Sequence, residues 1–259
     1  MFSKAGIYEA CGIFTTGHFI LIGITLISII IALKLTSKKD KEQVHKIIKC
    51  LTVPICILEI IKIIFNITVN SVKNINTYVP LYYCSMLIYA GLFSSFGKGM
   101  LKRIGDVFLA TGGIVGGIVF VLFPTTSIPS YPIFHFISLH SFFFHGTMIY
   151  LGLLVNITNY VELKKDDIKY FVTLVGTICV IALIVNNIFD SNLMFISKNF
   201  PNSPLEIIYN LTNGTILYNL IMISVQLTLP FYVPYWIIKK VKKVKIEESE
   251  EVKETIGAC

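Results

Sequence analysis

The chain has 259 residues, of which 54% are hydrophobic and only 14% are charged, with a net charge of +7. An ordinary soluble domain carries about 25% charged residues. Together with a mean hydropathy of +0.75, these values exclude a soluble cytosolic enzyme, a disordered chain, a coiled coil and a disulfide-stapled secreted module. The basic residues lie between long apolar blocks, which is typical of membrane topology and does not indicate a nucleic acid partner.

Seven apolar blocks approach the roughly 20 residues that a membrane-spanning helix needs. They lie near 14–35, 47–69, 79–97, 104–123, 133–155, 170–190 and 209–238. All should be helices, because the edge of an open sheet cannot satisfy its hydrogen bonds in lipid. We therefore predict an all-α, polytopic membrane protein with about seven transmembrane helices. Residues 1–238 would form one transmembrane domain and residues 239–259 a charged cytoplasmic tail.

The basic residues predict the orientation of this bundle. Of the 22 Lys and Arg residues, 18 fall on one side of the predicted spans; Lys4, Lys73 and Lys198 fall on the other, and Lys62 lies within a span. The positive-inside rule then places the N-terminus outside and the C-terminus in the cytoplasm. A multi-pass protein of the cell membrane follows.

Ionisable residues within the predicted spans are the candidates for function, because each is costly in hydrocarbon. The fifth span holds His135, His140 and His145, which is more than helix packing requires. Spaced five residues apart, His140 and His145 would point about 140° from each other, so both cannot face one partner squarely. We predict that at least one of the three is functional.

A cysteine and an ion pair are the next candidates. Cys84 is expected about one turn into the third span; a membrane cysteine is more often an apolar filler than a nucleophile. In the second span, Glu59 and Lys62 have the spacing of a self-neutralising ion pair or of a functional set. Asn187 and Asp190, at the end of the sixth span, would cap the helix or orient another group. Together with His140, the residues Cys84, Glu59, Asn187 and Asp190 fall in the outer half of the predicted membrane. We therefore expect a convergent polar site that opens outward.

A thiol beside an imidazole would suit nucleophilic acyl chemistry. The histidine would take the thiol proton, and an Asn or Tyr donor would stabilise the oxyanion. The six cysteines show no CxxC pair, so neither a zinc site nor a disulfide framework is indicated, and we expect no metal and no cofactor. Glycines at 112, 113, 116 and 117 form a GxxxG ridge that favours close helix packing.

Several motifs in this order resemble the YwaF-like bacterial integral membrane proteins. They are Phe14 to Phe19, Leu58 to Lys62, Pro80 to Cys84, Gly112 to Pro124, His140 to Gly146 and Asn187 to Asn192. More distantly, the chain is similar to a eukaryotic transmembrane acyltransferase of ether-phospholipid remodelling and to androgen-induced hydrolases of fatty-acid esters. The resemblance implies Cys84 as the nucleophile and His145 as the base, with His140 as competitor, and places His18 among substrate-binding or orienting residues.

Two functions remain open from the sequence. The first is an intramembrane lipid acyltransferase or ester hydrolase in which a membrane lipid is the substrate, Cys84 and a histidine act, and Asn187 or Asp190 orients. The second is a proton-coupled transporter or solute-binding protein that uses Glu59, Lys62 and the fifth-span histidines. A structural or assembly role is a third interpretation.

Overall fold

The computed structural model describes residues 1–71, 75–201 and 203–257, with side chains through Val244. All regular structure within these ranges is helical, which confirms the all-α part of the prediction. The α-helices are α1 (Thr16–Thr36), α2 (Lys41–Thr68), α3 (Met86–Phe96), α4 (Gly99–Phe108), α5 (Ile114–Leu122), α6 (Phe136–Ile157), α7 (Ile168–Phe189), α8 (Leu205–Leu211) and α9 (Ile216–Gly257). A π-helical segment, η2 (Leu109–Gly113), joins α4 to α5, and short 3-10 turns are η1 (Ile75–Thr77), η3 (Lys165–Asp167) and η4 (Leu193–Phe195).

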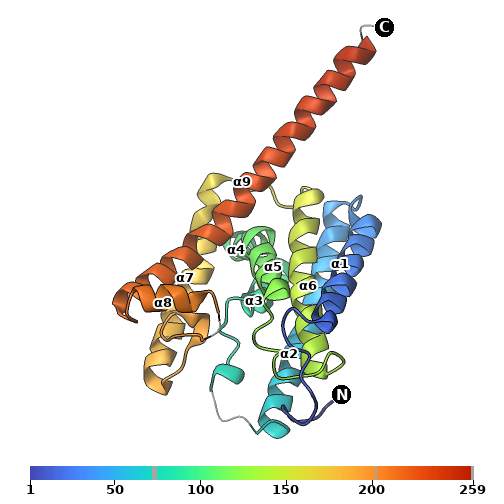
Figure 1. Cartoon of the computed structure of the whole chain (residues 1–259). Helices are drawn as coiled ribbons and strands as arrows, with labels where there is room; N and C mark the ends of the chain where they lie inside the picture. Colours follow the sequence, from blue (N-terminus) through green and yellow to red (C-terminus); the bar gives the residue numbers. More distant parts are fainter. Residues whose placement is uncertain (72–74, 202, 258–259) are drawn as a thin grey trace.

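The bundle has two flanks around a central group of helices (Figure 1). Helices α1, α2 and α6 form one flank, and α7, α8 and the first half of α9 form the other. Helices α3, α4 and α5 lie between them, where α4 contacts α7 and α5 contacts α6. The second half of α9 extends beyond the bundle as one continuous helix, so the predicted boundary near residue 238 coincides with no helix end.

Five helical segments are long and apolar enough to cross a membrane, counted over the residues that the structure describes. They are Thr16–Thr36, Gly99–Leu122, Phe136–Ile157, Lys165–Phe189 and Ile216–Val244. Each overlaps one predicted span, and the chain is a multi-pass membrane protein. The predicted third span is represented by α3, which has only 11 residues, and the predicted seventh is interrupted between α8 and α9.

The starts of three helices follow from local sequence signals. Thr15 caps α1 by accepting a hydrogen bond from the His18 backbone N–H at 3.3 Å. Asp40 and Gln43 form a reciprocal capping box at the start of α2, which satisfies two backbone donors that would otherwise lack partners. His135 caps α6, where its Nδ1 accepts from the Ile137 N–H at 3.1 Å. The first fifth-span histidine therefore has a structural role.

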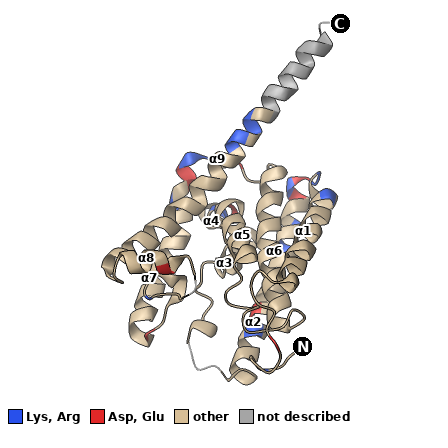
Figure 2. Cartoon of the chain, viewed as in Figure 1, with Lys and Arg blue, Asp and Glu red and all other residues tan. Residues whose placement is uncertain are grey.

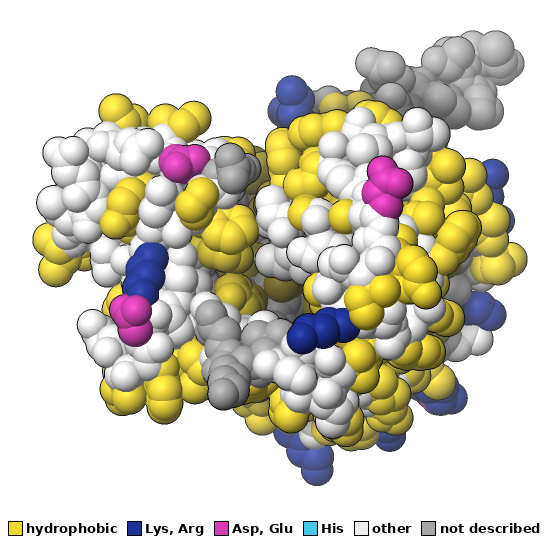
Figure 3. Space-filling model, turned by 60° about the horizontal axis from the view of Figure 1, so that its bottom comes forward, with side chains coloured by type: hydrophobic (Ala, Val, Ile, Leu, Met, Phe, Trp, Pro, Cys, Tyr) yellow, Lys and Arg dark blue, Asp and Glu magenta, His cyan; other side chains and the backbone are white. Residues whose placement is uncertain are grey.

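Charged residues are unevenly distributed over the molecule. Figure 2 shows Lys and Arg gathered at the end of the bundle formed by the α1–α2 hairpin and by the part of α9 that leaves the bundle. At this end Lys102 pairs with Asp106 at 2.7 Å and Arg103 pairs with Asp167 at 2.5 Å. Figure 3 shows the opposite end, whose visible face is largely hydrophobic and carries few charged side chains. This separation of charge is the pattern on which the predicted orientation depends.

The glycine ridge holds an aromatic side chain. A Cβ atom on Gly112 would lie 2.5 Å from the Tyr83 hydroxyl and 2.7 Å from Phe171, and one on Gly116 would lie 3.1 Å from the Tyr83 ring. The absence of side chains at these positions therefore lets Tyr83 pack against the π-helical segment. Such segments often mark functional regions of a helix, and this one supports the turn that carries Cys84.

Replacing Gly112 with Ala is expected to destabilise the protein by about 1–3 kcal/mol, because overpacking a dense core forces side chains and backbone to shift. The neighbouring Gly113→Ala variant is the matched control, since a Cβ there would make only ordinary contacts of 3.5 Å and longer. Unfolding of both variants in detergent would be compared with wild type. Equal stability of the two variants would contradict this account of the ridge.

Candidate functional site

A small polar cavity of about 60 Å³ lies among α2, α5, α6 and the segments that precede α3 and follow α5. Its lining contains most of the ionisable residues expected within the membrane. The lining residues are Glu59, Lys62, Ser85, Phe120, Thr126, His140, Ser141, Phe144 and His145. Glu59, His140 and His145 are each at most 6% exposed. The cavity is thus a buried polar site in a largely apolar molecule.

His145 presents an unpartnered ring nitrogen at this cavity. Its Nδ1 lies 2.7 Å from the backbone carbonyl oxygen of Ser141. A carbonyl oxygen only accepts, so Nδ1 carries the proton and donates, and Nε2 of the neutral ring holds a free lone pair. That Nε2 is buried without a hydrogen-bond partner. Phe120 stacks on the ring, with 3.5 Å between ring centroids and 8° between planes, and so fixes its orientation.

His140 has neither ring nitrogen hydrogen-bonded. Its Nε2 lies 3.8 Å from Glu59 Oε2, which is within ion-pair range but too long for a hydrogen bond. Buried polar groups in proteins are normally hydrogen-bonded, and an unsatisfied one requires an explanation. Two histidines with unsatisfied nitrogens at one cavity are well suited to receive a polar ligand group or water.

Glu59 and Lys62 form the ion pair that their spacing predicts. Lys62 Nζ donates to Glu59 Oε1 at 2.6 Å, and the two side chains are 26% and 6% exposed respectively. The second carboxylate oxygen faces His140. Glu59 therefore connects the lysine at the rim of the cavity to a histidine in its interior.

Cys84 lies beside the cavity, in the turn that precedes α3. This corrects the expectation of a position within a helix: α3 begins only at Met86. The turn is held by hydrogen bonds from the Tyr89 hydroxyl to the Pro80 carbonyl oxygen, at 3.1 Å, and from the Leu87 N–H to the Cys84 carbonyl oxygen, at 3.0 Å. Burial has the largest effect on the half-buried thiol and disfavours negative charge on the sulfur. The charge of Lys62 and nearby backbone N–H groups act in the opposite direction, whereas Glu59 adds to the effect of burial.

The other predicted site residues lie away from this cavity. Asn187 is exposed and donates to the Leu183 carbonyl oxygen of its own helix at 2.8 Å. Asp190, 93% exposed in its side chain, pairs with Lys198 at 2.5 Å. His18 is fully buried, and both of its ring nitrogens bond to backbone: Nε2 to the Val121 carbonyl oxygen at 2.9 Å, and Nδ1 to the Phe14 N–H at 3.0 Å. These contacts give His18 a role in joining α1 to the end of α5.

Comparison with known proteins identifies the family. A sequence model of the TMEM164 family matches residues 13–234, which include every helix from α1 to α8 and the first part of α9. The chain belongs to the TMEM164 family. No curated protein and no solved structure matches it.

In this TMEM164-family chain, several cavity residues were not predicted from sequence. Ser85 lies next to Cys84, and its side chain, unlike that of Cys84, lines the cavity. Ser141 supplies the carbonyl oxygen that selects the His145 tautomer, and Phe120 supplies the stacking ring. No sequence signal would have suggested the His145 contact, because every residue of an α-helix has a backbone carbonyl four residues before it.

Proposed function

We propose that this protein is an intramembrane lipid acyltransferase or ester hydrolase in which Cys84 is the nucleophile and His145 the base. The observation that carries the proposal is the unpartnered, buried Nε2 of His145, whose tautomer is fixed at Nδ1. It faces a cavity that also contains Ser85, the chain neighbour of Cys84. The resemblance to cysteine- and histidine-dependent lipid acyltransferases supports the same assignment.

The reaction would proceed in two acyl-transfer steps. In the first, the Cys84 thiol gives its proton to His145 Nε2, and the thiolate attacks the carbonyl carbon of a lipid ester. The ester C–O bond breaks, and the departing alcohol takes the proton from His145, leaving an acyl thioester on Cys84. In the second step, the hydroxyl of a lysolipid, or water, loses its proton to His145 and attacks the thioester. The C–S bond of the thioester breaks, and the departing thiolate takes the proton from His145, which restores the thiol and yields either a new ester or a free acid.

The position of Cys84 beside the cavity bears on the first proton transfer. A general base can act directly or through one water molecule, and in ligand-free structures these contacts are often long. The turn from Pro80 to Ser85 is anchored at both ends. The Cys84 side chain would therefore turn toward His145 by rotation about its own bonds, while the backbone stays in place. The orienting role expected for Asn187 or Asp190 is supplied in this site by the Ser141 carbonyl oxygen.

The proposal includes the finer topology. With α2 and α3 counted as spans, seven helices would cross the membrane. The membrane would be the cell membrane, with the N-terminus outside and the C-terminus in the cytoplasm. The lysine-rich hairpin and the tail of α9 would then face the cytoplasm. The cavity, toward the opposite end of α2, would lie in the outer half of the membrane, where a lipid could enter between helices.

Labelling with an activated-ester acyl probe tests this assignment. The purified wild-type protein should form an adduct that maps to Cys84. The His145→Gln variant should label about 10² to 10⁴ times more slowly, which is the usual contribution of a general base. Cys179→Ala, which removes a buried cysteine of α7, is the control and should label as wild type. An adduct on another cysteine, or equal labelling rates for wild type and His145→Gln, would contradict the proposal.

Proton-coupled transport is the alternative, and the contacts of Glu59 with both Lys62 and His140 favour it. A carboxylate that pairs with a lysine in one state and a histidine in another could couple proton movement to a solute. In that case Glu59→Gln would stop solute uptake into vesicles, whereas Cys84→Ser would leave it intact. The enzyme proposal predicts instead that Cys84→Ser loses nearly all turnover of a lipid ester.

A further inference from the structure

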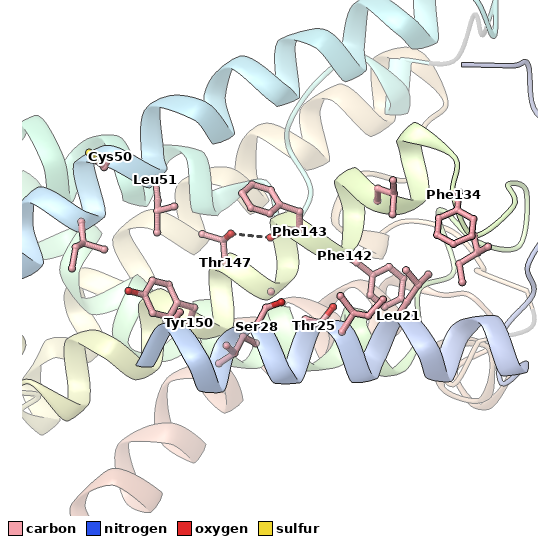
Figure 4. Close-up of a pocket in the computed structure, with 17 residues that line it drawn as sticks. Leu21, Thr25, Ser28, Cys50, Leu51, Phe134, Phe142, Phe143, Thr147 and Tyr150 are labelled. Atoms are coloured by element: carbon pink, nitrogen blue, oxygen red, sulfur yellow. Dashed lines mark hydrogen bonds between the residues drawn. The ribbon is translucent and has the colours of Figure 1, made fainter. Parts of the chain in front are cut away.

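A second hollow lies on the flank formed by α1, α2 and α6. It is an apolar groove of about 670 Å³, about ten times the volume of the polar cavity. Figure 4 shows side chains of α1, α2 and α6 turned toward it, among them Leu21, Leu51, Phe142, Phe143 and Tyr150. This volume is within the range of sites that hold a small organic ligand.

Helix α6 separates the groove from the polar cavity. Leu139, Phe142, Phe143, Gly146 and Thr147 line the groove, whereas the intervening residues His140, Ser141, Phe144 and His145 line the cavity. With 100° between successive helix residues, the two sets occupy opposite faces. The groove is therefore a site separate from the proposed catalytic centre.

The groove is accessible from the bilayer. In the spanning part of α1 only 17% of residues are buried, compared with 83% in α6, and the groove residues Ile24 and Ser28 of α1 are exposed. Along α1 the lining extends from Leu21 to Ala32, about 16 Å at 1.5 Å per residue. On the α6 side the lining extends further, from Ile133 and Phe134 before the helix to Tyr150 within it, so the groove is long enough for an extended acyl chain.

Positive charge is concentrated at one end of the groove. Tyr150, a groove residue of α6, bonds through its hydroxyl to Thr36 Oγ1 at 3.0 Å, at the end of α1. The adjoining α1–α2 hairpin carries exposed lysines, namely Lys34, Lys38, Lys39, Lys41, Lys46 and Lys49. Its two acidic residues are engaged: Asp40 caps α2, and Glu42 pairs with Lys46 at 2.7 Å. Residues 34–49 thus carry six lysines against two acids, a net charge of +4.

We propose that this groove binds one acyl chain of an anionic phospholipid whose headgroup contacts the lysines of the α1–α2 hairpin. The apolar lining, a length sufficient for an extended acyl chain and the cationic end together match that ligand. A zwitterionic lipid would fit the groove but would lack the attraction of the hairpin, because lysines near the surface favour anionic lipids. The proposal holds whether or not the polar cavity is catalytic.

Fluorescence quenching by brominated lipids tests the proposal. The chain has a single tryptophan, Trp236 on α9, and Trp236→Phe gives a background without one. Onto it we would place Ser28→Trp, at the groove, or Ile27→Trp, the matched control, which is 59% exposed and lies outside the groove lining. Each protein is placed in phosphatidylcholine vesicles that contain an equal minor fraction of brominated phosphatidylglycerol or brominated phosphatidylcholine.

At Ser28→Trp, quenching should show about fivefold or greater preference for phosphatidylglycerol, whereas at Ile27→Trp the two lipids should quench alike. Adding Lys38→Gln and Lys39→Gln should reduce the preference at the groove. Equal quenching by both lipids at Ser28→Trp would overturn the proposal, as would absence of quenching there. Native mass spectrometry of the wild-type chain provides a readout without a substituted groove: retention of phosphatidylcholine as readily as phosphatidylglycerol would also overturn it.

Discussion

Replacing Cys84 with Ala is expected to abolish turnover of a lipid ester, with a loss of at least about 10³-fold. Without the thiol, no acyl thioester can form, and the buried histidines have no nucleophile to activate. The fold should persist, because Cys84 lies half-buried in a turn and removal of one sulfur leaves the backbone bonds of that turn intact. Release of labelled fatty acid, and its transfer to an added lysolipid, would both be measured.

Two matched variants make that loss interpretable. Cys179→Ala removes a more deeply buried cysteine, 2% exposed on α7, and should lower stability somewhat while turnover persists. Cys84→Ser retains the size of the side chain but replaces the thiol by a poorer nucleophile, and should retain at most a small residual rate. Full activity of Cys84→Ala would exclude the cysteine mechanism.

The helical, membrane-spanning character of the chain was accessible from the sequence, because the length of an apolar helix follows from the thickness of the bilayer. Block lengths predicted the positions of α1, α6 and α7 to within a few residues. The region from residue 79 to 97 was less accessible. It reads as one apolar block, yet Pro80 and the bonded turn up to Ser85 delay the helix to Met86. A continuous hydrophobic block does not show which of its residues form a turn held by tertiary contacts and which form the helix.

The sequence selected several residues that share one cavity in the structure. Glu59, Lys62, His140 and His145 were selected because ionisable groups in hydrocarbon face one another, and all four line the polar cavity. The cost of burial gives no position for a polar residue at a helix end, because water and the lipid headgroups can form hydrogen bonds with its side chain there. Asn187 and Asp190 occupy such a place, and the exposed Asp190 pairs with Lys198. Likewise, the two backbone contacts of His18 depend on a tertiary approach that no local pattern encodes.

Two histidines that point in different directions can still serve one cavity. Although helical spacing sets His140 and His145 about 140° apart, both line the same cavity. The expectation that only one could face a given partner therefore holds for a single atom but not for a cavity of this size. In the proposed reaction, this arrangement would place a second imidazole near the substrate, with Glu59 behind it.

Replacing Lys62 with Met is expected to destabilise the protein by about 3–5 kcal/mol, because it leaves the Glu59 carboxylate buried without its partner. Glu59 has a side-chain exposure of 6% and Lys62 of 26%. The double variant Glu59→Gln and Lys62→Met should recover most of this loss, since no unpaired charge remains. Lys46→Met breaks an ion pair of the same helix at nearly the same distance, 2.7 Å, but with both side chains at least 70% exposed, and should change stability little. Unfolding in mixed detergent micelles would measure all four proteins. A double variant as unstable as Lys62→Met would show that the lysine acts through packing and not through the charge of Glu59.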